Sequence, residues 1–453
     1  MKLRSKIKAW VTAFYAPNIQ KYVSEYMQTD HYSSEQIEQY QMQKLHALLA
    51  FSYQHVPYYH RLFDSLGLKP TDFQSTSDLQ RLPILTKEII RREGSNMYAD
   101  ISQKGVKLTS TSGSSGHPVV LRKTKQAREI EQALMYRYKL NGGINPNNCS
   151  LVMWGGHSFS FAGSIRNKIK QWLLNEYLFD TYHITDKSIS DIISILNTGK
   201  VSYLRGYTSA VYYVAQEILA RGLCYNIPFV SVSAEKLLDS QRTIIEKAFG
   251  PNLFDQYGCG ECGAIAYECK EHNGLHHNFE HSVLEVLDDN NSPAATGRVV
   301  LTNLDNYAMP LIRYENGDMV TLSDTKCACG RQSMLIKCIE GRTYDMIYGE
   351  NGRKVHAALL TDVLLNVDVL TKYPIKQWQI VQKEPLLFIC KYIAPYPILE
   401  IDRIEMERIY QKYLGEHVQL IMMQVDWMYI PKSGKRHYVI PYEKYLANTE
   451  LYD

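Results

Sequence analysis

The sequence predicts an α/β protein: a large N-terminal domain with mixed, mainly parallel sheets flanked by helices, an antiparallel part, and a small α+β domain at the C-terminus. Short apolar runs that alternate with helical periodicity carry the first part of this prediction. The expected strands are residues 151–154, 201–204, 229–232 and 253–257. The helices expected between them are residues 189–196, 209–221 and 240–249.

From about residue 280 the pattern changes. Apolar and polar residues alternate in 283–287 and 298–302, which is typical of antiparallel sheet. After Gly341-Arg342 the chain starts again with short strands around a helix, at residues 379–381, 386–392, 401–414 and 418–425. We therefore expect a large domain over 1–341, whose antiparallel part covers about 262–340, and a small mobile domain of common size over 342–453.

Composition bounds the class of protein. The chain has 453 residues, of which 45% are hydrophobic and 21% charged, and this is ordinary for a globular protein with a large core. The net charge of +3 is too small to indicate nucleic acid as a partner. No apolar run reaches the length of a transmembrane helix. An oligomer is compatible with these features.

Residues 1–15 predict an amphipathic helix. Its apolar face consists of Leu3, Ile7, Trp10, Val11 and Phe14. The apolar part is too short for a signal peptide, and no small-residue cleavage site follows it. Packing of this helix on the core is the simpler interpretation, and weak contact with a membrane surface is the alternative.

A hydroxyl- and glycine-rich stretch lies between two short predicted strands: Thr109-Ser110-Thr111-Ser112-Gly113-Ser114-Ser115-Gly116-His117-Pro118. The flanks predict a hairpin with this stretch at its tip. Glycines let backbone N–H groups turn toward an anion, and hydroxyls add donors, as in a phosphate-binding loop. The Gly-Lys-Ser/Thr of a Walker A loop is missing. On composition alone, a flexible linker is an equal alternative.

Cysteine spacing indicates a metal site. Five of the nine cysteines lie between residues 259 and 329, which favours metal ligation over disulfides and hence a reducing cytoplasm. The predicted ligands of a closed, structural zinc ion are Cys269, His276, Cys327 and Cys329. Alternative ligands are His272, His277, Cys259 and Cys262. Scattered reduced cysteines are the simpler interpretation.

In a parallel sheet, ligands bind at the carboxyl ends of the strands. Three loops follow predicted strands at this edge, namely residues 155–157, 233–235 and 258–261. Their sequences are Gly-Gly-His, Ser-Ala-Glu and Gly-Cys-Gly-Glu. Each loop therefore combines small residues with a histidine or glutamate that can bind a ligand or exchange a proton. We expect the functional site along these loops.

Six motifs then occur in a fixed order. Thr-Ser-Gly-Ser-Ser-Gly-x-Pro at 111–118 is followed by Tyr-Gly-x-x-Glu at 257–261. The other four are residues 297–302 with 309–318, residues 327–331, residues 341–347, and a terminal Gly434-Lys435. In this order they resemble the adenylate-forming enzyme superfamily, and more narrowly the phenylacetate–coenzyme A ligase family with its CapK-like branch of capsular polysaccharide biosynthesis. The resemblance covers roughly residues 40–440.

The resemblance implies roles for residues of this chain in binding ATP and Mg²⁺. Residues that would surround the phosphates and nucleotide are Thr111, Ser112, Gly113, Ser114, Ser115, Gly116, Ser233, Ala234, Glu235, Gln256, Tyr257 and Gly258. Tyr257 would lie against adenine, and Asp318 would bind the ribose hydroxyls. Glu261 would hold Mg²⁺, a cation that prefers oxygen ligands.

Three further residues would act at the junction with the small domain. Arg342 would lie near the ribose or phosphate. Asp345 would be the hinge on which the small domain rotates. Lys435 would stabilise the α-phosphate as a compact point charge, with Lys432 as its competitor. Without the resemblance, a lone Gly-Lys is usually a solvated loop, and Asp318 could be a plain ion-pair partner.

The acid-binding pocket is the least readable part of the sequence. The resemblance assigns it Trp154, His157, Phe159, Arg205 and Tyr207. Aromatic residues at this spacing are more often plain core. His157 could accept a proton, and Arg205 could recognise an anionic acid or acceptor.

The function that the resemblance implies is ATP-dependent activation of a carboxylic acid. The AMP-forming ligase would make an acyl-adenylate and transfer the acyl group to coenzyme A. The alternative within the class is transfer to an amine or hydroxyl in surface-polysaccharide biosynthesis. An alternative of another class is a non-catalytic, zinc-stabilised binding protein.

Overall fold

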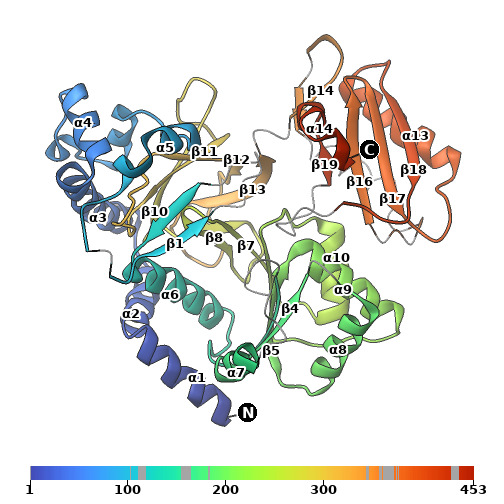
Figure 1. Ribbon diagram of the computed structural model, residues 1–453, viewed down its shortest axis with the longest axis horizontal. Coiled ribbons are helices and arrows are strands. Elements are labelled where there is room, and N and C mark those ends of the chain that lie inside the picture. Colours follow the sequence, from blue (N-terminus) through green and yellow to red (C-terminus); the bar gives the residue numbers. More distant parts are fainter. Residues whose placement is uncertain are drawn as a thin grey trace. The chain divides into compact units, whose positions relative to one another are not determined.

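The computed structural model describes residues 2–452 except 103, 111–118, 155–164, 182–183, 343–345, 353, 357–359, 361–371, 374, 376 and 430–437. The chain forms two compact units (Figure 1). The first unit comprises Met1–Leu237, Gln241–Asn316 and Val320–Ile339. The second comprises Leu238–Ser240, Gly317–Met319 and Glu340–Asp453.

The part of the chain up to residue 249 contains most of the described helices. They are α1 (Lys2–Tyr15), α2 (Ile19–Thr29), α3 (Ser34–His55), α4 (Pro57–Leu66), α5 (Lys87–Glu93), α6 (Lys125–Asn141), α7 (Ile165–Leu173), α8 (Asp186–Asn197), α9 (Thr208–Ala220) and α10 (Asp239–Phe249). At four of these helices the N-cap hydroxyl accepts a hydrogen bond from a backbone N–H of the first turn. The capping residues are Ser33, Thr86, Thr124 and Thr185. Short 3-10 helices lie at Pro70–Asp72, Thr76–Arg81 and Gly94–Met97.

One sheet of eleven strands forms the backbone of the first unit, in the order β10-β11-β12-β13-β9-β8-β7-β6-β5-β3-β4. Its strands are β3 (Cys149–Trp154), β4 (Glu176–Asp180), β5 (Val201–Tyr207), β6 (Phe229–Ser233), β7 (Leu253–Cys259), β8 (Gly263–Glu268), β9 (Leu275–His277), β10 (Ser282–Leu287), β11 (Thr296–Asn303), β12 (Tyr314–Leu322) and β13 (Leu335–Arg342). The pairs from β4 to β7 are parallel, whereas β7–β8 and β8–β9 are antiparallel. The predicted parallel and antiparallel parts are therefore continuous, and they meet between β7 and β8.

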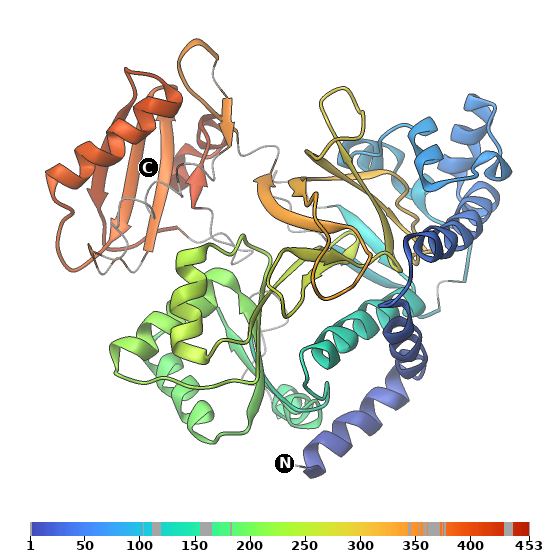
Figure 2. The same ribbon diagram turned by 180° about the vertical axis from the view of Figure 1, so that it is seen from behind.

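Helices α8, α9 and α10 lie together over the parallel strands (Figures 1 and 2). Their apolar residues share one core with alternate residues of the strands, such as Leu151, Met153 and Leu204. The intervening residues point to the opposite face, where Tyr203 packs with Tyr138 of α6. Since Arg205 and Tyr207 follow Tyr203 at intervals of two, they share this second face.

The two segments that flank the hydroxyl-rich stretch pair as the strands of a hairpin, as the sequence predicts. β1 (Lys107–Ser110) pairs antiparallel with β2 (Val120–Lys123), and Ser110 lies opposite Val120. Leu108 and Val120 are exposed. The hairpin brings the two ends of residues 111–118 together.

The second unit is built on a four-stranded sheet in the order β18-β17-β16-β19. Its elements are β14 (Met346–Tyr348), β15 (Lys354–His356), β16 (Gln377–Glu384), β17 (Leu387–Ile393), α13 (Glu400–Leu414), β18 (Gln419–Gln424), β19 (Val439–Ile440), α14 (Tyr442–Leu446) and α15 (Thr449–Tyr452), with a turn of 3-10 helix at Glu350–Gly352. Helix α13 contributes Met406, Tyr410 and Leu414 to the core of this unit. The α+β character predicted for the C-terminal part is confirmed.

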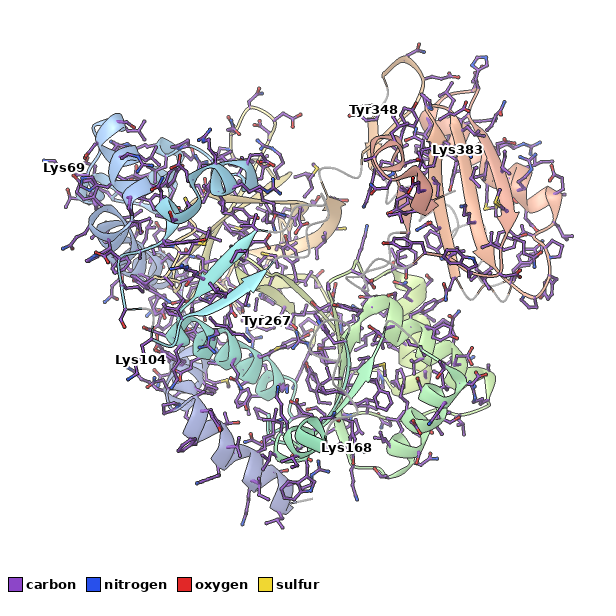
Figure 3. The ribbon with its side chains drawn as sticks, viewed as in Figure 1. Lys69, Lys104, Lys168, Tyr267, Tyr348 and Lys383 are labelled. Carbon is purple, nitrogen blue, oxygen red and sulfur yellow. The ribbon has the colours of Figure 1, made fainter. Side chains whose placement is uncertain are left out.

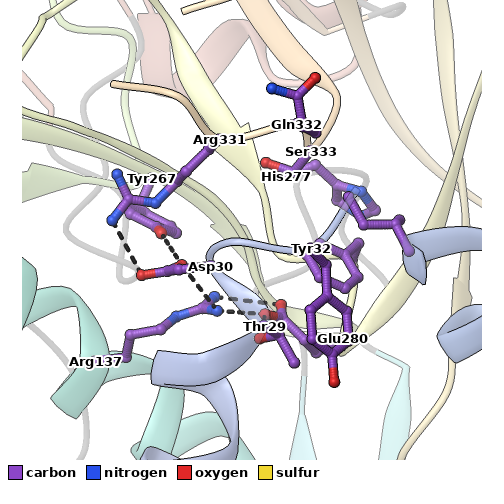
Figure 4. A pocket seen from close by; sticks show the side chains of 12 residues that line it. Thr29, Asp30, Tyr32, Arg137, Tyr267, His277, Glu280, Arg331, Gln332 and Ser333 are labelled. Atoms are coloured by element: carbon purple, nitrogen blue, oxygen red, sulfur yellow. Dashed lines mark hydrogen bonds and ion pairs between the residues drawn. The ribbon is translucent and has the colours of Figure 1, made fainter. Parts of the chain in front are cut away.

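A buried ionic network connects α2, α6 and the segment around β9 (Figure 4). The guanidinium of Arg137 is 2% exposed and donates to the carboxylate of Glu280 and, at 2.7 Å, to Asn278. Asp30 lies 3.5 Å from Arg137 and accepts a hydrogen bond of 3.0 Å from Arg331. The network lines a cavity of about 10 Å³, close to the smallest that holds one water molecule. The ionic network therefore has a structural role, because it holds α2, α6 and the segment around β9 together.

Among the described residues, no helix combines the length and the apolar character that crossing a bilayer requires.

Candidate functional site

Glu261 lies in the turn between β7 and β8, where the sheet changes from parallel to antiparallel. Its carboxylate accepts a hydrogen bond of 3.0 Å from the Tyr314 hydroxyl and lies 3.4 Å from Nζ of Lys87. Burial by itself would raise the pKa of Glu261, but the charge of Lys87 and the hydrogen bonds outweigh burial and lower that pKa. Glu261 is therefore an ionised, nearly buried carboxylate whose oxygens suit a hard cation.

Tyr257 and Gly258 precede this turn at the end of β7. The Tyr257 hydroxyl accepts a hydrogen bond of 2.8 Å from Asn316 of β12, and the side chain is buried. A Cβ on Gly258 would lie 2.6 Å from the carbonyl oxygen of Gly263, so only glycine permits this approach of β7 to β8. The Tyr-Gly-x-x-Glu motif thus has a packing role at its first two positions and places a carboxylate at its last.

The loop after β6 holds the next predicted residues. Ser233 donates to the carbonyl oxygen of Gln256 at 2.7 Å, which joins the ends of β6 and β7. Ala234 has φ 73°, which is a left-handed backbone conformation. This conformation is unfavourable in energy for a residue with a Cβ, and residues that adopt it cluster at functional sites. The Glu235 carboxylate accepts from the backbone N–H and the hydroxyl of Ser209, at 2.7 and 3.0 Å. Glu235 thereby caps the N-terminus of α9.

Trp154, Arg205 and Tyr207 lie together at the carboxyl ends of β3 and β5. The rings of Trp154 and Tyr207 are 4.3 Å apart between centroids, and Cζ of Arg205 lies 4.8 Å from the Trp154 centroid. Nε of Arg205 is buried without a hydrogen-bond partner. Within the part of the chain that the structure describes, no carboxylate pairs with this guanidinium. Two aromatic rings and a cation that pairs with no described carboxylate therefore share one corner of the sheet.

The four predicted zinc ligands converge. The ligand atoms of Cys269, His276, Cys327 and Cys329 lie within 4.8 Å of one another. Cys269 Sγ is 3.5 Å from Cys327 Sγ, and Cys329 Sγ is 3.3 Å from His276 Nε2. Tetrahedral zinc with bonds of about 2.0–2.3 Å requires ligand separations of this order. Burial lowers the pKa of His276 to about 4, so its imidazole is neutral and able to bind a metal at pH 7.

The alternative ligands are engaged elsewhere. Nε2 of His277 lies 3.0 Å from the Ser282 hydroxyl, and Nδ1 of His272 lies 3.1 Å from Glu268. The backbone N–H of Cys262 donates to Cys259 Sγ at 3.3 Å. Among the described residues, these groups are separate from the cluster of Cys269, His276, Cys327 and Cys329. The donor set fits the zinc site predicted from the spacing, with His276 as its imidazole.

Sequence comparison relates the chain to known ligases. Phenylacetate-coenzyme A ligase of Thermus thermophilus is 26% identical over 355 residues, which cover 75% of this chain and 78% of that protein. Protein CapK of Staphylococcus aureus is 25% identical over 281 residues, which cover 60% of this chain and 61% of that protein. No protein-family model matches the chain. The chain is thus similar in sequence to phenylacetate–coenzyme A ligases and to CapK.

Structural comparison agrees. The structure of 2-hydroxyisobutyryl-CoA ligase in the postadenylation state, in complex with R3-HIB-AMP, superposes with a TM-score of 0.74 at 18% sequence identity. The match covers 93% of this chain and 94% of that chain. The fold of this chain is therefore the adenylate-forming ligase fold, as the resemblance implies.

Several predicted residues lie outside the described part of the chain. They are Thr111 to Gly116, His157, Phe159, Asp345, Lys432 and Lys435. Arg342 ends β13, but its side chain lies outside the described residues, and Asp318 is half-buried on β12. The roles of these residues stay predictions.

Two contacts of Glu261 were not predicted. Lys87 is the first residue of α5, and Tyr314 begins β12, so both are far from Glu261 in the sequence. Tyr314 belongs to the 309–318 motif and Lys87 to none of the six, and the order of the motifs does not show that either residue contacts Glu261.

The Lys87–Glu261 pair gives a first prediction. Lys87→Met leaves a carboxylate without its cation where side-chain exposures are 14% and 8%, so we expect a loss of about 3 kcal/mol in the free energy of unfolding at pH 7. Ionised Glu261 stabilises the native state above its unfolded-state pKa of about 4.3, and this stabilisation is lost as the pH falls through the lower folded-state pKa. The deficit of the variant should therefore shrink on acidification below about pH 4.

Urea unfolding over this pH range measures the effect. The matched control is Lys69→Met, which removes an exposed lysine of the same unit. A Lys87→Met deficit equal to that of the control, or one that grows on acidification, would contradict the pairing.

The metal cluster gives a second prediction. Metal analysis of the purified chain should give about one zinc per molecule. Cys327→Ser should lower the zinc content and reduce the free energy of unfolding by about 4 kcal/mol. This is the stabilisation that a bound ion gives when its free concentration is roughly 1,000 times its Kd. Cys224→Ser, at an exposed free cysteine, is the control and should change neither quantity. Wild-type protein free of zinc after growth in zinc-replete medium would refute the site.

Proposed function

We propose that the chain is an AMP-forming carboxylate ligase that activates a carboxylic acid with ATP and Mg²⁺. The carboxylate oxygen attacks the α-phosphorus of ATP, pyrophosphate leaves, and an acyl-adenylate forms. The thiol of coenzyme A then attacks the acyl carbon and AMP leaves, which yields a thioester. The position of ionised Glu261 between β7 and β8, in a chain similar in sequence to phenylacetate-coenzyme A ligase, is the observation that carries this proposal.

The residues would divide the work as follows. Glu261 would hold Mg²⁺, which supplies charge neutralisation to the phosphates, and Lys87 and Tyr314 would orient the carboxylate. Residues 111–116, at the tip of the β1–β2 hairpin, would bind the β- and γ-phosphates. Lys435 would stabilise charge on the α-phosphate. We infer that these groups act through positioning and electrostatics, because phosphoryl and nucleotidyl transfer need little covalent help.

Coenzyme A is the first-choice acceptor. Transfer to an amine or hydroxyl of a surface-polysaccharide precursor is the second, and similarity to CapK favours it. Addition of coenzyme A to enzyme, ATP and a competent acid separates the two, since only the first yields a thioester. The enzyme would work in the cytoplasm, where ATP and coenzyme A are available and thiols stay reduced.

Formation of the acyl-adenylate tests the proposal. Enzyme, ATP, Mg²⁺ and a panel of acids, without coenzyme A, should yield an acyl-AMP mass for at least one acid. Lys435→Ala should reduce its rate of formation about 100-fold or more, as expected when a preorganised charge is removed from a transition state. Lys432→Ala is the matched control and should stay within a few-fold of wild type. The reverse pattern would assign the role to Lys432.

Arg205 gives a prediction about the acid. Arg205 is two residues before the end of β5 and opposite Ser231, so it lies about 7 Å deeper than the strand end where the carboxylate would react. A guanidinium at that depth that pairs with no described carboxylate suits an acid with a second anionic group. We expect higher kcat/KM for dicarboxylic acids than for monocarboxylic acids of equal length.

Arg205→Met should lower kcat/KM for the dicarboxylic acid about 30-fold, because a hydrogen bond to a charged group contributes about this factor. The same substitution should change kcat/KM for the monocarboxylic acid less than about threefold. Arg408→Met, at an exposed arginine, is the control. Equal losses for both acids would show that Arg205 does not read a second charge.

A further inference from the structure

Helices α1 and α7 form a basic corner of the first unit. α1 carries four lysines and arginines and α7 carries three, and neither helix contains an aspartate or glutamate. The whole chain is nearly balanced, with 50 basic and 47 acidic residues. The two helices lie next to each other in both ribbon views (Figures 1 and 2). The excess of positive charge is thus local.

The apolar face predicted to pack α1 on the core instead faces solvent over most of its length. Leu3, Trp10 and Phe14 are 69%, 70% and 70% exposed. The helix is docked along one edge of this face, where Val11 is buried and Lys8 lies 3.4 Å from Glu176 of β4. Lys8 is buried while Trp10 is exposed, because Lys8 pairs with Glu176. The spacing of apolar residues in the sequence does not reveal this ion pair.

Arg4 of α1 contacts α7 beside an exposed apolar residue of that helix. This side chain donates to the carbonyl oxygen of Trp172 at 3.3 Å, and its Cζ lies 6.0 Å from that ring. Trp172 and Ile169 of α7 are themselves exposed. On α1, the rings of Trp10 and Phe14 stack at 6.1 Å. Leu3 to Phe14 spans about 16 Å along the helix, so the apolar area is a patch.

Exposed cations accompany the patch. Lys6 lies on the outward face of α1, and Lys168 and Lys170 lie on α7; Lys168 is labelled in Figure 3. A protein–protein interface is depleted in lysine, and a nucleic-acid site does not need exposed leucine and isoleucine. Tryptophan, phenylalanine and leucine among lysines, without acids, match the water–lipid boundary of an anionic bilayer.

We propose that the corner formed by α1 and α7 binds the surface of anionic phospholipid membranes. Leu3, Trp10, Phe14 and Trp172 insert among the headgroups, while Lys6, Lys168 and Lys170 contact lipid phosphates. The inference is independent of the chemistry at Glu261, since it rests on helices that the proposed reaction does not use. It brings the enzyme to the membrane surface through the exposed side chains of α1 and α7.

Co-sedimentation of the full chain with extruded vesicles tests the proposal. The protein should bind vesicles of phosphatidylcholine and phosphatidylglycerol in equal amounts, bind pure phosphatidylcholine far more weakly, and dissociate in high salt. Lys6→Gln/Lys168→Gln/Lys170→Gln should weaken partitioning about 100-fold, because each cation near an anionic surface contributes about fivefold. Trp10→Ala/Phe14→Ala should also abolish binding. All replaced side chains are exposed, so circular dichroism and the thermal midpoint should stay unchanged.

Matched variants serve as controls. Lys69→Gln/Lys104→Gln/Lys247→Gln removes three exposed lysines elsewhere, and Trp427→Ala removes a tryptophan that is 73% exposed. Both should bind like wild type. Brominated acyl chains should quench the fluorescence of wild type more than that of Trp10→Phe. No binding to anionic vesicles at low salt would overturn the proposal, as would equal loss in the control variants. Self-association abolished by Trp10→Ala/Phe14→Ala, without lipid binding, would assign the patch to a second copy.

Discussion

The guanidinium of Arg137 is the buried charge on which the assembly of the first unit depends. Burial of a cation costs several kcal/mol unless its charge is paired, and here Glu280, Asn278 and the carbonyl oxygen of Tyr26 accept from its two terminal nitrogens, whereas Nε has no partner among the described residues. Burial would raise the pKa of Asp30, but the charges of Arg137 and Arg331 outweigh burial and lower it. Because Arg331 follows two of the cysteines of the metal cluster, one ionic network ties α2 and α6 to that cluster.

The topology of the sheet brings the candidate site residues to one edge. The parallel strands β3, β5, β6 and β7 end on the same edge, and the chain reverses direction after β7. Glu261 occupies that reversal, Ala234 adopts a strained backbone after the neighbouring strand β6, and the tilted rings of Trp154 and Tyr207 lie 4.3 Å apart at the ends of β3 and β5. Glu235 caps α9 and so holds two of these loops at a fixed separation. A carboxylate, a strained loop and an aromatic corner are thereby aligned in the order in which metal, nucleotide and acid would bind.

Local pattern was enough to predict much of this arrangement. The strand–helix alternation from 151 to 257, the hairpin around residues 111–118 and the Cys-x6-His and Cys-x-Cys pairs all depend on short-range spacing, and the structure has them. The interactions that spacing does not encode were missed. Lys87 meets Glu261 across 174 positions of the chain, strand β4 (Glu176–Asp180) lies at an edge of the sheet, and α1 faces outward because Lys8 pairs with Glu176. Each depends on a long-range partner that one sequence does not reveal.

The central claim is that the chain joins an acid to AMP, and the exchange of labelled pyrophosphate into ATP tests it most directly. Metal-replete enzyme with ATP, Mg²⁺ and a broad panel of acids should incorporate label only when a competent acid is present, and dicarboxylic acids should be the best. Because the exchange needs no acceptor, it separates adenylation from the identity of the second substrate. Absence of acid-dependent exchange with every acid of the panel, from folded protein that retains its metal, would contradict the claim.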